Sequence, residues 1–220
     1  MKKASSMIEL VIAIVVMGIA MMSLPLMLTR TQSNNEFAMQ QEAILAARTQ
    51  IGDILTYRWD ENSTNSKFVS AVLDTNSTNF KRYPDENSTR RIGHVKGDKR
   101  RKFFNAITPA TSVAHLGNLF DGNDTDDIDD FKDTNKTVVD SSEITNLDYR
   151  FDFNMTTNVG YVSDAFIPGK TFVFNTATLG TTTNIKMVEL TLKGAGLSTF
   201  KFRAYTTNIG QGQLLRRVYN

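Results

Sequence analysis

The densest group of residues that could do chemistry is an acidic run between positions 121 and 133. It holds seven aspartates, which repel one another unless they are solvated or neutralised, and Ca²⁺ accepts about six to eight oxygen ligands from such loops. The EF-hand pattern fails, because the sixth position from Asp121 is Asp126 instead of glycine and the twelfth is Lys132 instead of glutamate. Two interpretations stay open, a Ca²⁺ site and a solvated surface loop. The candidate ligands are Asp121, Asp124, Asp126, Asp127, Asp129 and Asp130.

Other residue types argue against an enzyme. The chain has no cysteine, which excludes disulfides, thiolate nucleophiles, thiolate zinc sites and iron-sulfur clusters. Its two histidines, His94 and His115, stand in unrelated contexts, and no G-x-S-x-G, H-E-x-x-H or glycine-rich phosphate loop occurs. We therefore expect no catalytic residue, and no cofactor other than Ca²⁺.

A basic cluster balances the acidic run. With 25 Lys and Arg against 23 Asp and Glu, the net charge of +2 names no partner. The cluster could be a solvated loop, a contact with another subunit, or a surface for nucleic acid. Only Phe103 and Phe104 adjoin it, too few aromatic residues for base stacking, so nucleic acid is not the expected partner. Its members are Arg90, Arg91, Lys96, Lys99, Arg100, Arg101 and Lys102.

Every N-x-S/T sequence in the chain has an aspartate two residues before its asparagine. The six pairs are Asp60 with Asn62, Asp74 with Asn76, Asp85 with Asn87, Asp121 with Asn123, Asp133 with Asn135, and Asp152 with Asn154. If acidic residues filled about a quarter of such positions, six independent matches would occur about once in a few thousand trials; three of the sites look like copies of one another. The arrangement resembles the D/E-x-N-x-S/T acceptor of bacterial oligosaccharyltransferases, which modify exported proteins. It predicts glycosylation at Asn62, Asn76, Asn87, Asn123 and Asn135, and least at Asn154, which falls in a predicted strand.

The N-terminus carries the longest apolar run. Between Met7 and Leu28 the only charge is Glu9, and the nineteen residues after Glu9 would span about 28 Å as a helix, close to the hydrocarbon thickness of about 30 Å. Lys2 and Lys3 favour a cytoplasmic N-terminus with the rest exported. A secretory signal has a shorter apolar core. A plain single-pass anchor leaves Glu9 unexplained, since a carboxylate in such a helix costs about 2.5 to 3.5 kcal/mol.

Residues 4–14, Ala-Ser-Ser-Met-Ile-Glu-Leu-Val-Ile-Ala-Ile, resemble the leader of type IV pilins and type II secretion pseudopilins. In that family a prepilin peptidase cuts after a small residue on the cytoplasmic side, and a glutamate lies five residues past the cut. The resemblance implies cleavage between Ala4 and Ser5, N-methylation of Ser5, and retention of Glu9. Ala4 replaces the usual glycine and Ser5 the usual phenylalanine.

The resemblance implies a structural subunit of a type IV pilus or a type II secretion pseudopilus. In the filament, the new amine of Ser5 would neutralise Glu9 of a neighbouring subunit. The expected partners are other pilin subunits, prepilin peptidase and the cytoplasmic membrane. The long, irregular head favours a minor subunit, and residues 126–131 are similar to a stretch in minor pilins of mannose-sensitive haemagglutinin type. The alternative is a single-pass anchored binding module that never polymerises.

The elements that position these residues follow from periodicity. We expect a leader at 1–4, a transmembrane and assembly helix at 5–29 with kinks at Gly18 and Pro25, an amphipathic helix at 30–59, and a β-rich head at 60–220. Between Asn35 and Tyr57 the predicted buried face leaves Gln50 outside it. That face comprises Phe37, Ile44, Ala47, Ile51, Ile54 and Leu55.

The strongest strand patterns lie late in the chain. Alternating residues predict strands at 146–155, 170–174, 185–193 and 199–207, with a turn at 194–196 joining the last two. The expected fold is therefore α+β, with a long N-terminal helix packed on a C-terminal, mainly antiparallel sheet. The pilin family shares this plan by resemblance.

Overall fold

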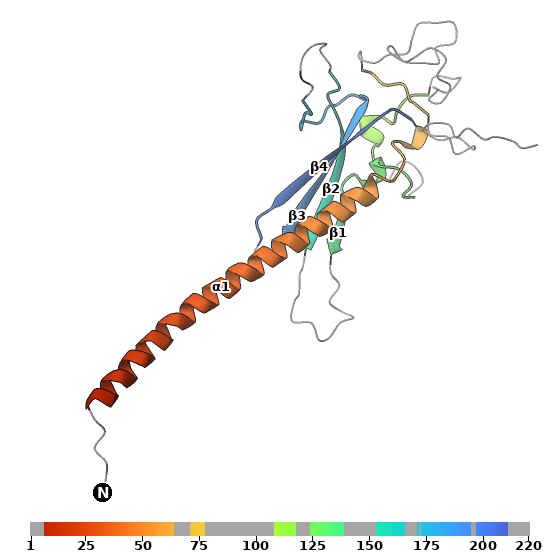
Figure 1. Cartoon of the computed structure of the whole chain (residues 1–220). Coiled ribbons are helices and arrows are strands. Elements are labelled where there is room, and N and C mark those ends of the chain that lie inside the picture. Colours follow the sequence, from red (N-terminus) through yellow and green to blue (C-terminus); the bar gives the residue numbers. More distant parts are fainter. Residues whose placement is uncertain are drawn as a thin grey trace, which may run out of the picture. The chain divides into compact units, whose positions relative to one another are not determined.

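The computed structural model describes residues 7–63, 71–77, 108–117, 124–138, 153–165, 171, 173–194 and 197–210. It divides into two compact units, Met1–Leu45 and Ala46–Asn220. One long helix, α1 (Met7–Ile54), begins in the first unit and ends in the second (Figure 1). The remaining elements are η1 (Glu61–Ser63), η2 (Val113–His115), η3 (Asp129–Phe131), β1 (Thr134–Val138), β2 (Phe153–Val162), β3 (Ile185–Gly194) and β4 (Phe200–Thr207).

The four strands form one antiparallel sheet in the order β1-β2-β3-β4 (Figure 1). This confirms the α+β class and the strands predicted at 185–193 and 199–207. The strand predicted at 146–155 overlaps β2 only from Phe153 onward, and residues 146–152 lie outside the described residues. The strand predicted at 170–174 is wrong for its described residues, which have no regular structure. Strand β1 was not predicted.

α1 ends at Ile54, earlier than the predicted boundary. The hydroxyl of Thr56 donates to the carbonyl of Asp53 at 2.7 Å, which favours termination there because the side chain competes for a backbone acceptor. Four residues further on, the carbonyl of Arg58 accepts a hydrogen bond from Ile128 N at 2.9 Å. Directly after the helix ends, the chain is therefore hydrogen-bonded to the acidic run at Ile128.

The core of the second unit lies between the end of α1 and one face of the sheet. Ile54 packs with Val159 of β2 and Val188 of β3, and all three are buried. These two strand residues face each other in the β2–β3 register. A second buried cluster extends the core beyond the helix end, and it contains Trp59, Leu73, Ala110, Leu116 and Tyr161.

The predicted buried face of the amphipathic helix needs correction. Ile44 and Leu55 are 44% and 40% exposed, whereas Gln50, predicted to lie outside the face, is only 8% exposed. Gln50 is buried because its Oε1 accepts a hydrogen bond from Lys136 Nζ of β1 at 2.7 Å. A hydrogen-bond partner on the sheet therefore allows a glutamine to be buried, which the apolar periodicity alone does not predict.

Candidate functional site

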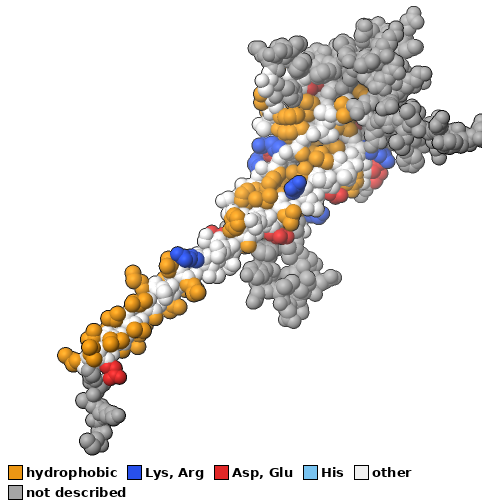
Figure 2. All heavy atoms as spheres, in the orientation of Figure 1, with side chains coloured by type: hydrophobic (Ala, Val, Ile, Leu, Met, Phe, Trp, Pro, Cys, Tyr) orange, Lys and Arg blue, Asp and Glu red, His pale blue; other side chains and the backbone are white. Residues whose placement is uncertain are grey.

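The first half of α1 presents a continuous apolar surface. Hydrophobic side chains cover this part of the helix in Figure 2, and every residue from Met7 to Leu28 is exposed. By length and composition α1 could cross a membrane, and none of its apolar window is buried. A core helix of a soluble protein would bury such a window in its own fold. The helix is therefore compatible with a membrane anchor.

The predicted assembly residues lie at known places on this helix. Glu9 is exposed in the first turn of α1, where the helix dipole favours a negative charge. Ala4 and Ser5 lie outside the described residues. Apart from the adjoining backbone of its own helix, Gly18 has no heavy atom within 4 Å of the place a Cβ would occupy, and the helix continues through Pro25. The kinks at these two positions stay predictions.

Hydroxyl groups within the apolar segment are satisfied by their own helix. Ser23 Oγ donates to the carbonyl of Ala20 at 2.8 Å, and Thr29 Oγ1 donates to that of Leu26 at 2.9 Å. In hydrocarbon each unsatisfied donor would cost several kcal/mol, so internal bonds of this kind remove an obstacle to insertion.

The acidic run is not uniformly solvated. Asp127, Asp129 and Asp130 are at most 2% exposed, whereas Asp124 is exposed. The predicted solvated loop is therefore wrong for the three buried aspartates. No group of three or more acidic or histidine side chains could hold a metal ion in the part of the chain that the structure describes, which does not include Asp121. The Ca²⁺ site stays a prediction.

Two buried aspartates bind the backbone of their own turn. Oδ1 of Asp127 accepts hydrogen bonds from the N–H groups of Asp129 at 2.7 Å and Asp130 at 3.2 Å. Oδ2 of Asp130 accepts from the N–H groups of Asp126 and Asp127, both at 2.9 Å. These bonds satisfy donors that the short η3 helix leaves unpaired. They explain why aspartate recurs here at close spacing.

A buried lysine on the sheet joins this turn to the end of α1. Lys186 of β3 is fully buried, and its Nζ donates to Oδ2 of Asp60 at 2.9 Å and to Oδ1 of Asp129 at 2.5 Å. A third bond, to the carbonyl of Trp59 at 2.7 Å, uses its remaining donor. The ammonium also lies 4.4 Å from the Trp59 ring centroid and 5.4 Å from that of Tyr161, within cation–π range. We call these five residues the Lys186 cluster.

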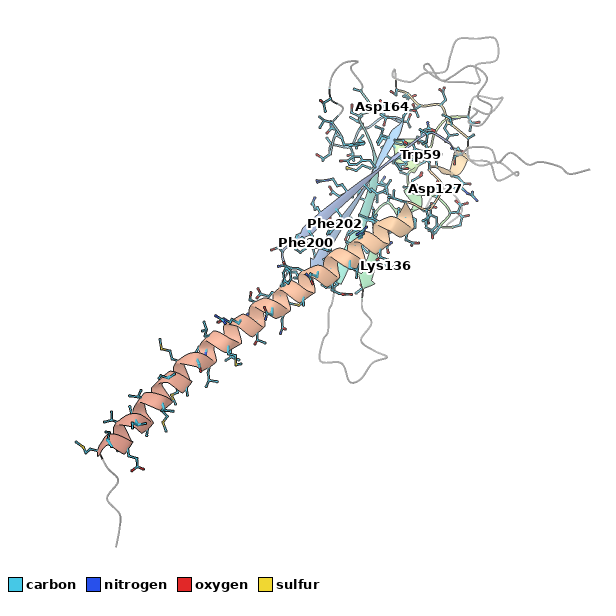
Figure 3. All side chains as sticks on the ribbon, viewed as in Figure 1. Trp59, Asp127, Lys136, Asp164, Phe200 and Phe202 are labelled. Atoms are coloured by element: carbon cyan, nitrogen blue, oxygen red, sulfur yellow. The ribbon has the colours of Figure 1, made fainter. Side chains whose placement is uncertain are left out.

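Further hydrogen bonds hold the side chain of Asp60 in place. Oδ2 of Asp60 accepts a bond from the N–H of Thr111, and Oδ1 accepts one from the Thr111 hydroxyl, both at 3.0 Å. The Tyr161 hydroxyl donates to the carbonyl of Thr111 at 2.7 Å. Figure 3 shows Trp59 and Asp127 on the loops beyond the C-terminal end of α1. Five separate segments, which contribute Asp60, Thr111, Asp129, Tyr161 and Lys186, therefore meet around the ammonium of Lys186.

Burial and charge shift the acidities around the cluster. Burial opposes the charge of Lys186, but the nearby carboxylates of Asp60 and Asp129 outweigh it and raise the pKa of the ammonium. Burial, reinforced by the charge of Asp129, raises the pKa of the Asp127 carboxyl to about 9. Oδ2 of Asp127 is buried without a hydrogen-bond partner, which fits a protonated group. Burial and Asp126 also raise the pKa of Glu61 to about 7.

The structure places four of the six N-x-S/T asparagines, and all four are exposed. Asn62 follows the Lys186 cluster, Asn76 lies in a bend, and Asn135 and Asn154 lie on β1 and β2. The other two sequences, at 87 and 123, and the basic cluster at 90–102 lie outside the described residues. Of the two charged loops predicted from the sequence, the structure therefore describes only part of the acidic run, residues 124–133.

The Lys186 cluster was missed by the sequence analysis, although one signal pointed to it. In β3 the residues Lys186, Val188, Leu190 and Leu192 share one face by period two, and the last three are apolar. A lysine in register with such a face needs a buried anionic partner. The search for that partner would have led to the aspartates of the acidic run.

Comparisons of this chain with known protein families, with curated proteins and with solved structures found no match. Its function is therefore inferred from its own sequence and structure.

Proposed function

We propose that this chain is a minor structural subunit of a type IV pilus or a type II secretion pseudopilus, made as a prepilin and assembled through α1. The observation that carries the proposal is a single carboxylate, Glu9, in the first turn of a helix whose next nineteen residues are uncharged and exposed. The resemblance to the pilin leader implies cleavage between Ala4 and Ser5, which would create a positively charged partner for Glu9.

The physical reason is the cost of a carboxylate in hydrocarbon. An unpaired Glu9 within the bilayer costs about 2.5 to 3.5 kcal/mol on insertion scales. The amine that cleavage creates on Ser5 of a neighbouring subunit would neutralise it, and an ion pair of this kind forms only in one register. Glu9 is thus an assembly residue, and the apolar surface of α1 packs against lipid before assembly and against other helices afterwards.

The head is compatible with a structural role. The fully buried Lys186 donates to Asp60, Asp129 and a backbone carbonyl, all within the fold. The buried carboxylates of Asp127 and Asp130 bind the backbone of their own turn. These charged groups hold the described head together.

Replacement of Glu9 by leucine tests the proposal. Glu9→Leu makes membrane insertion easier, so the variant should accumulate in the membrane fraction, while its incorporation into sheared filaments or pseudopili should fall at least about tenfold, equivalent to about 1.4 kcal/mol. The matched control is Glu36→Leu, which removes an exposed carboxylate of the same helix beyond the apolar run and should assemble normally.

Two results would count against the proposal. Normal incorporation of Glu9→Leu would show that the carboxylate has no part in assembly. If the unsubstituted chain never enters a filament in its host, the chain is better explained as an anchored binding module that does not polymerise.

A further inference from the structure

The recurrent D-x-N-x-S/T sequences have no part in helix assembly, yet all six N-x-S/T sites of the chain carry the aspartate. We propose that the head is an acceptor for N-linked glycosylation, and that Asn76 and Asn135 are its acceptors among the described residues. The donor would be an oligosaccharide linked through a diphosphate to a membrane lipid. This inference does not depend on polymerisation, since it concerns the exported face of any anchored head.

The transfer involves one bond made and one broken. Nδ2 of the asparagine attacks the anomeric carbon of the first sugar and forms a C–N bond. The bond between that carbon and the phosphate oxygen breaks, and the lipid diphosphate leaves. The proton that the amide loses passes to a base of the transferase, and because a C–N bond replaces a C–O bond without a change of oxidation state, no oxidant or reductant is needed. The acceptor amide must therefore be reachable from solvent, as must the acidic and hydroxyl residues two positions to either side that define the sequence.

The asparagines of the N-x-S/T sequences, called sequon asparagines below, differ in exposure from two asparagines in the interior of the fold. Asn62, Asn76, Asn135 and Asn154 are all exposed. By contrast, Asn184 and Asn208, which lie outside any N-x-S/T sequence, are 4% and 1% exposed. The four described sequon asparagines thus lie at the surface, as do Asn158 and Asn175 outside any N-x-S/T sequence, so exposure permits transfer at these sites and the aspartate-containing sequence distinguishes them.

The Asn62 site fails the requirement that the acidic residue of the sequence be reachable from solvent. Its preceding acid, Asp60, is fully buried in the Lys186 cluster, with its two oxygens bound to Lys186, Thr111 and the N–H of Asn62. A transferase that reads this carboxylate cannot reach it in the folded head. The aspartate here has a structural role, and we infer that Asn62 is not an acceptor in the folded head.

The two strand sites differ because one strand is internal and the other is not. Asn154 lies opposite Thr137, and Asn135 lies opposite Thr156, so the two sequences pair with each other. β2 is hydrogen-bonded to β1 on one side and to β3 on the other, which holds Asn154 in a ladder on both edges. β1 is the end strand of the described sheet.

The Asn135 site is exposed along its whole length. Asp133, Asn135 and Thr137 are all exposed. Asp133 has a φ of 57°, the left-handed conformation of a turn, directly before the strand begins. Acid, amide and hydroxyl therefore stand together at the surface, on a strand whose other edge carries no described partner.

The Asn76 site lies outside the sheet. Asp74 is half-buried and Asn76 is exposed in a bend. The N–H of Asn76 donates to Oγ1 of Thr182 at 3.0 Å, and Ser77 Oγ donates to the buried Asp164 at 2.7 Å. These bonds hold the backbone against the fold, Asp74 pairs with Pro109 in an isolated β-bridge, and the side chain of Asn76 stays exposed; Thr78, the hydroxyl residue of this sequence, lies outside the described residues.

Glycopeptide mass spectrometry of the full chain isolated from its host tests the proposal. Peptides with Asn76 and with Asn135 should carry a carbohydrate mass, and peptides with Asn62 and with Asn154 should be bare. Bare peptides at both Asn76 and Asn135 would overturn the proposal. Equal occupancy of Asn62 would overturn the assignment by folded-state access, because Asp60 is buried.

Single substitutions of the preceding acid give a second test that leaves each asparagine intact. Asp133→Asn, which tolerates a positive φ, should lower occupancy of Asn135 at least tenfold without changing Asn76, and Asp74→Asn should do the reverse. Asp53→Asn, an exposed acid of α1 outside any sequon, is the control and should change neither. Unchanged occupancy in both test variants would show that the aspartates are not read.

Discussion

Replacement of Lys186 by methionine should destabilise the head more than any surface change of the same kind. Methionine fills a similar volume but leaves Asp60 and Asp129 buried without a cation. Removal of one partner from a buried ion pair typically costs about 3 to 5 kcal/mol, because a charge remains without compensation. For a domain of this size, about 2 to 4 °C of melting temperature corresponds to 1 kcal/mol. The expected loss is therefore about 6 to 20 °C.

The sheet offers a matched control for this variant. Lys201 of β4 pairs with Glu189 of β3 at 3.0 Å, but its side chain is 52% exposed, and Arg203 binds the same carboxylate at 2.7 Å. An exposed pair contributes about 0 to 1 kcal/mol. Lys201→Met should therefore melt close to the unsubstituted chain. Both variants remove a lysine of the same sheet that binds carboxylate oxygens, Lys186 two carboxylates in the interior and Lys201 one at the surface.

The fluorescence of Trp59 is a suitable assay. It is the only tryptophan of the chain, it is 7% exposed, and it belongs to the Lys186 cluster. Thermal unfolding of the full-length chain in detergent micelles would be followed by the shift of this emission. Melting temperatures of Lys186→Met and Lys201→Met within about 2 °C of each other would refute the reasoning, since the buried pair would then hold nothing together.

Two further predictions concern the same sheet and turn. Burial raises the pKa of the Asp127 carboxyl to about 9, so the folded chain keeps the carboxyl proton at a pH where the unfolded chain, which releases it near pH 4, does not. The free energy of unfolding should therefore fall as the pH rises from about 4 to 9. Asp127→Asn keeps the oxygen that accepts from the N–H of Asp129 but cannot titrate. In urea denaturation, its free energy of unfolding should exceed that of the unsubstituted chain at pH 8 by on the order of 1 to 3 kcal/mol, and the two should converge near pH 4. A difference that does not change with pH would contradict this. At Gly160, an added Cβ would lie 2.7 Å from Cγ2 of Thr178, so Gly160→Ala should cost about 1 to 3 kcal/mol in thermal unfolding. Thr178→Ser removes that methyl and should restore most of the loss, and failure of this rescue would show that another contact is responsible.

Apolar periodicity was sufficient for the helix and for the two C-terminal strands. β3 alternates from Val188 to Lys193 and β4 from Phe200 to Ala204, and α1 carries an uncharged run of membrane-spanning length, so local pattern and tertiary environment agree. β1 was missed because its residues, Thr-Asn-Lys-Thr-Val, are mostly polar. Its pairing with β2, including a bond from Thr156 Oγ1 to Asn135 Oδ1 at 2.7 Å, compensates for the weak apolar content.

The buried charges could not be placed from composition. A run of seven aspartates is usually solvated, and nothing in its spacing shows that Asp129 meets a lysine 57 residues later. The partner itself was visible, since Lys186 interrupts an apolar strand face, but the pairing depends on the fold. In the same way, Asp60 looks like part of a glycosylation sequence, and only its burial reveals the structural role.

The N-terminus of the protein isolated from its host is the most direct test of the pilin proposal. Intact-mass and N-terminal peptide measurements should find a chain that begins at Ser5, shortened by Met1 to Ala4, with the methyl group on its new amine. A chain that still begins at Met1 would leave Glu9 without its partner and would contradict the proposal.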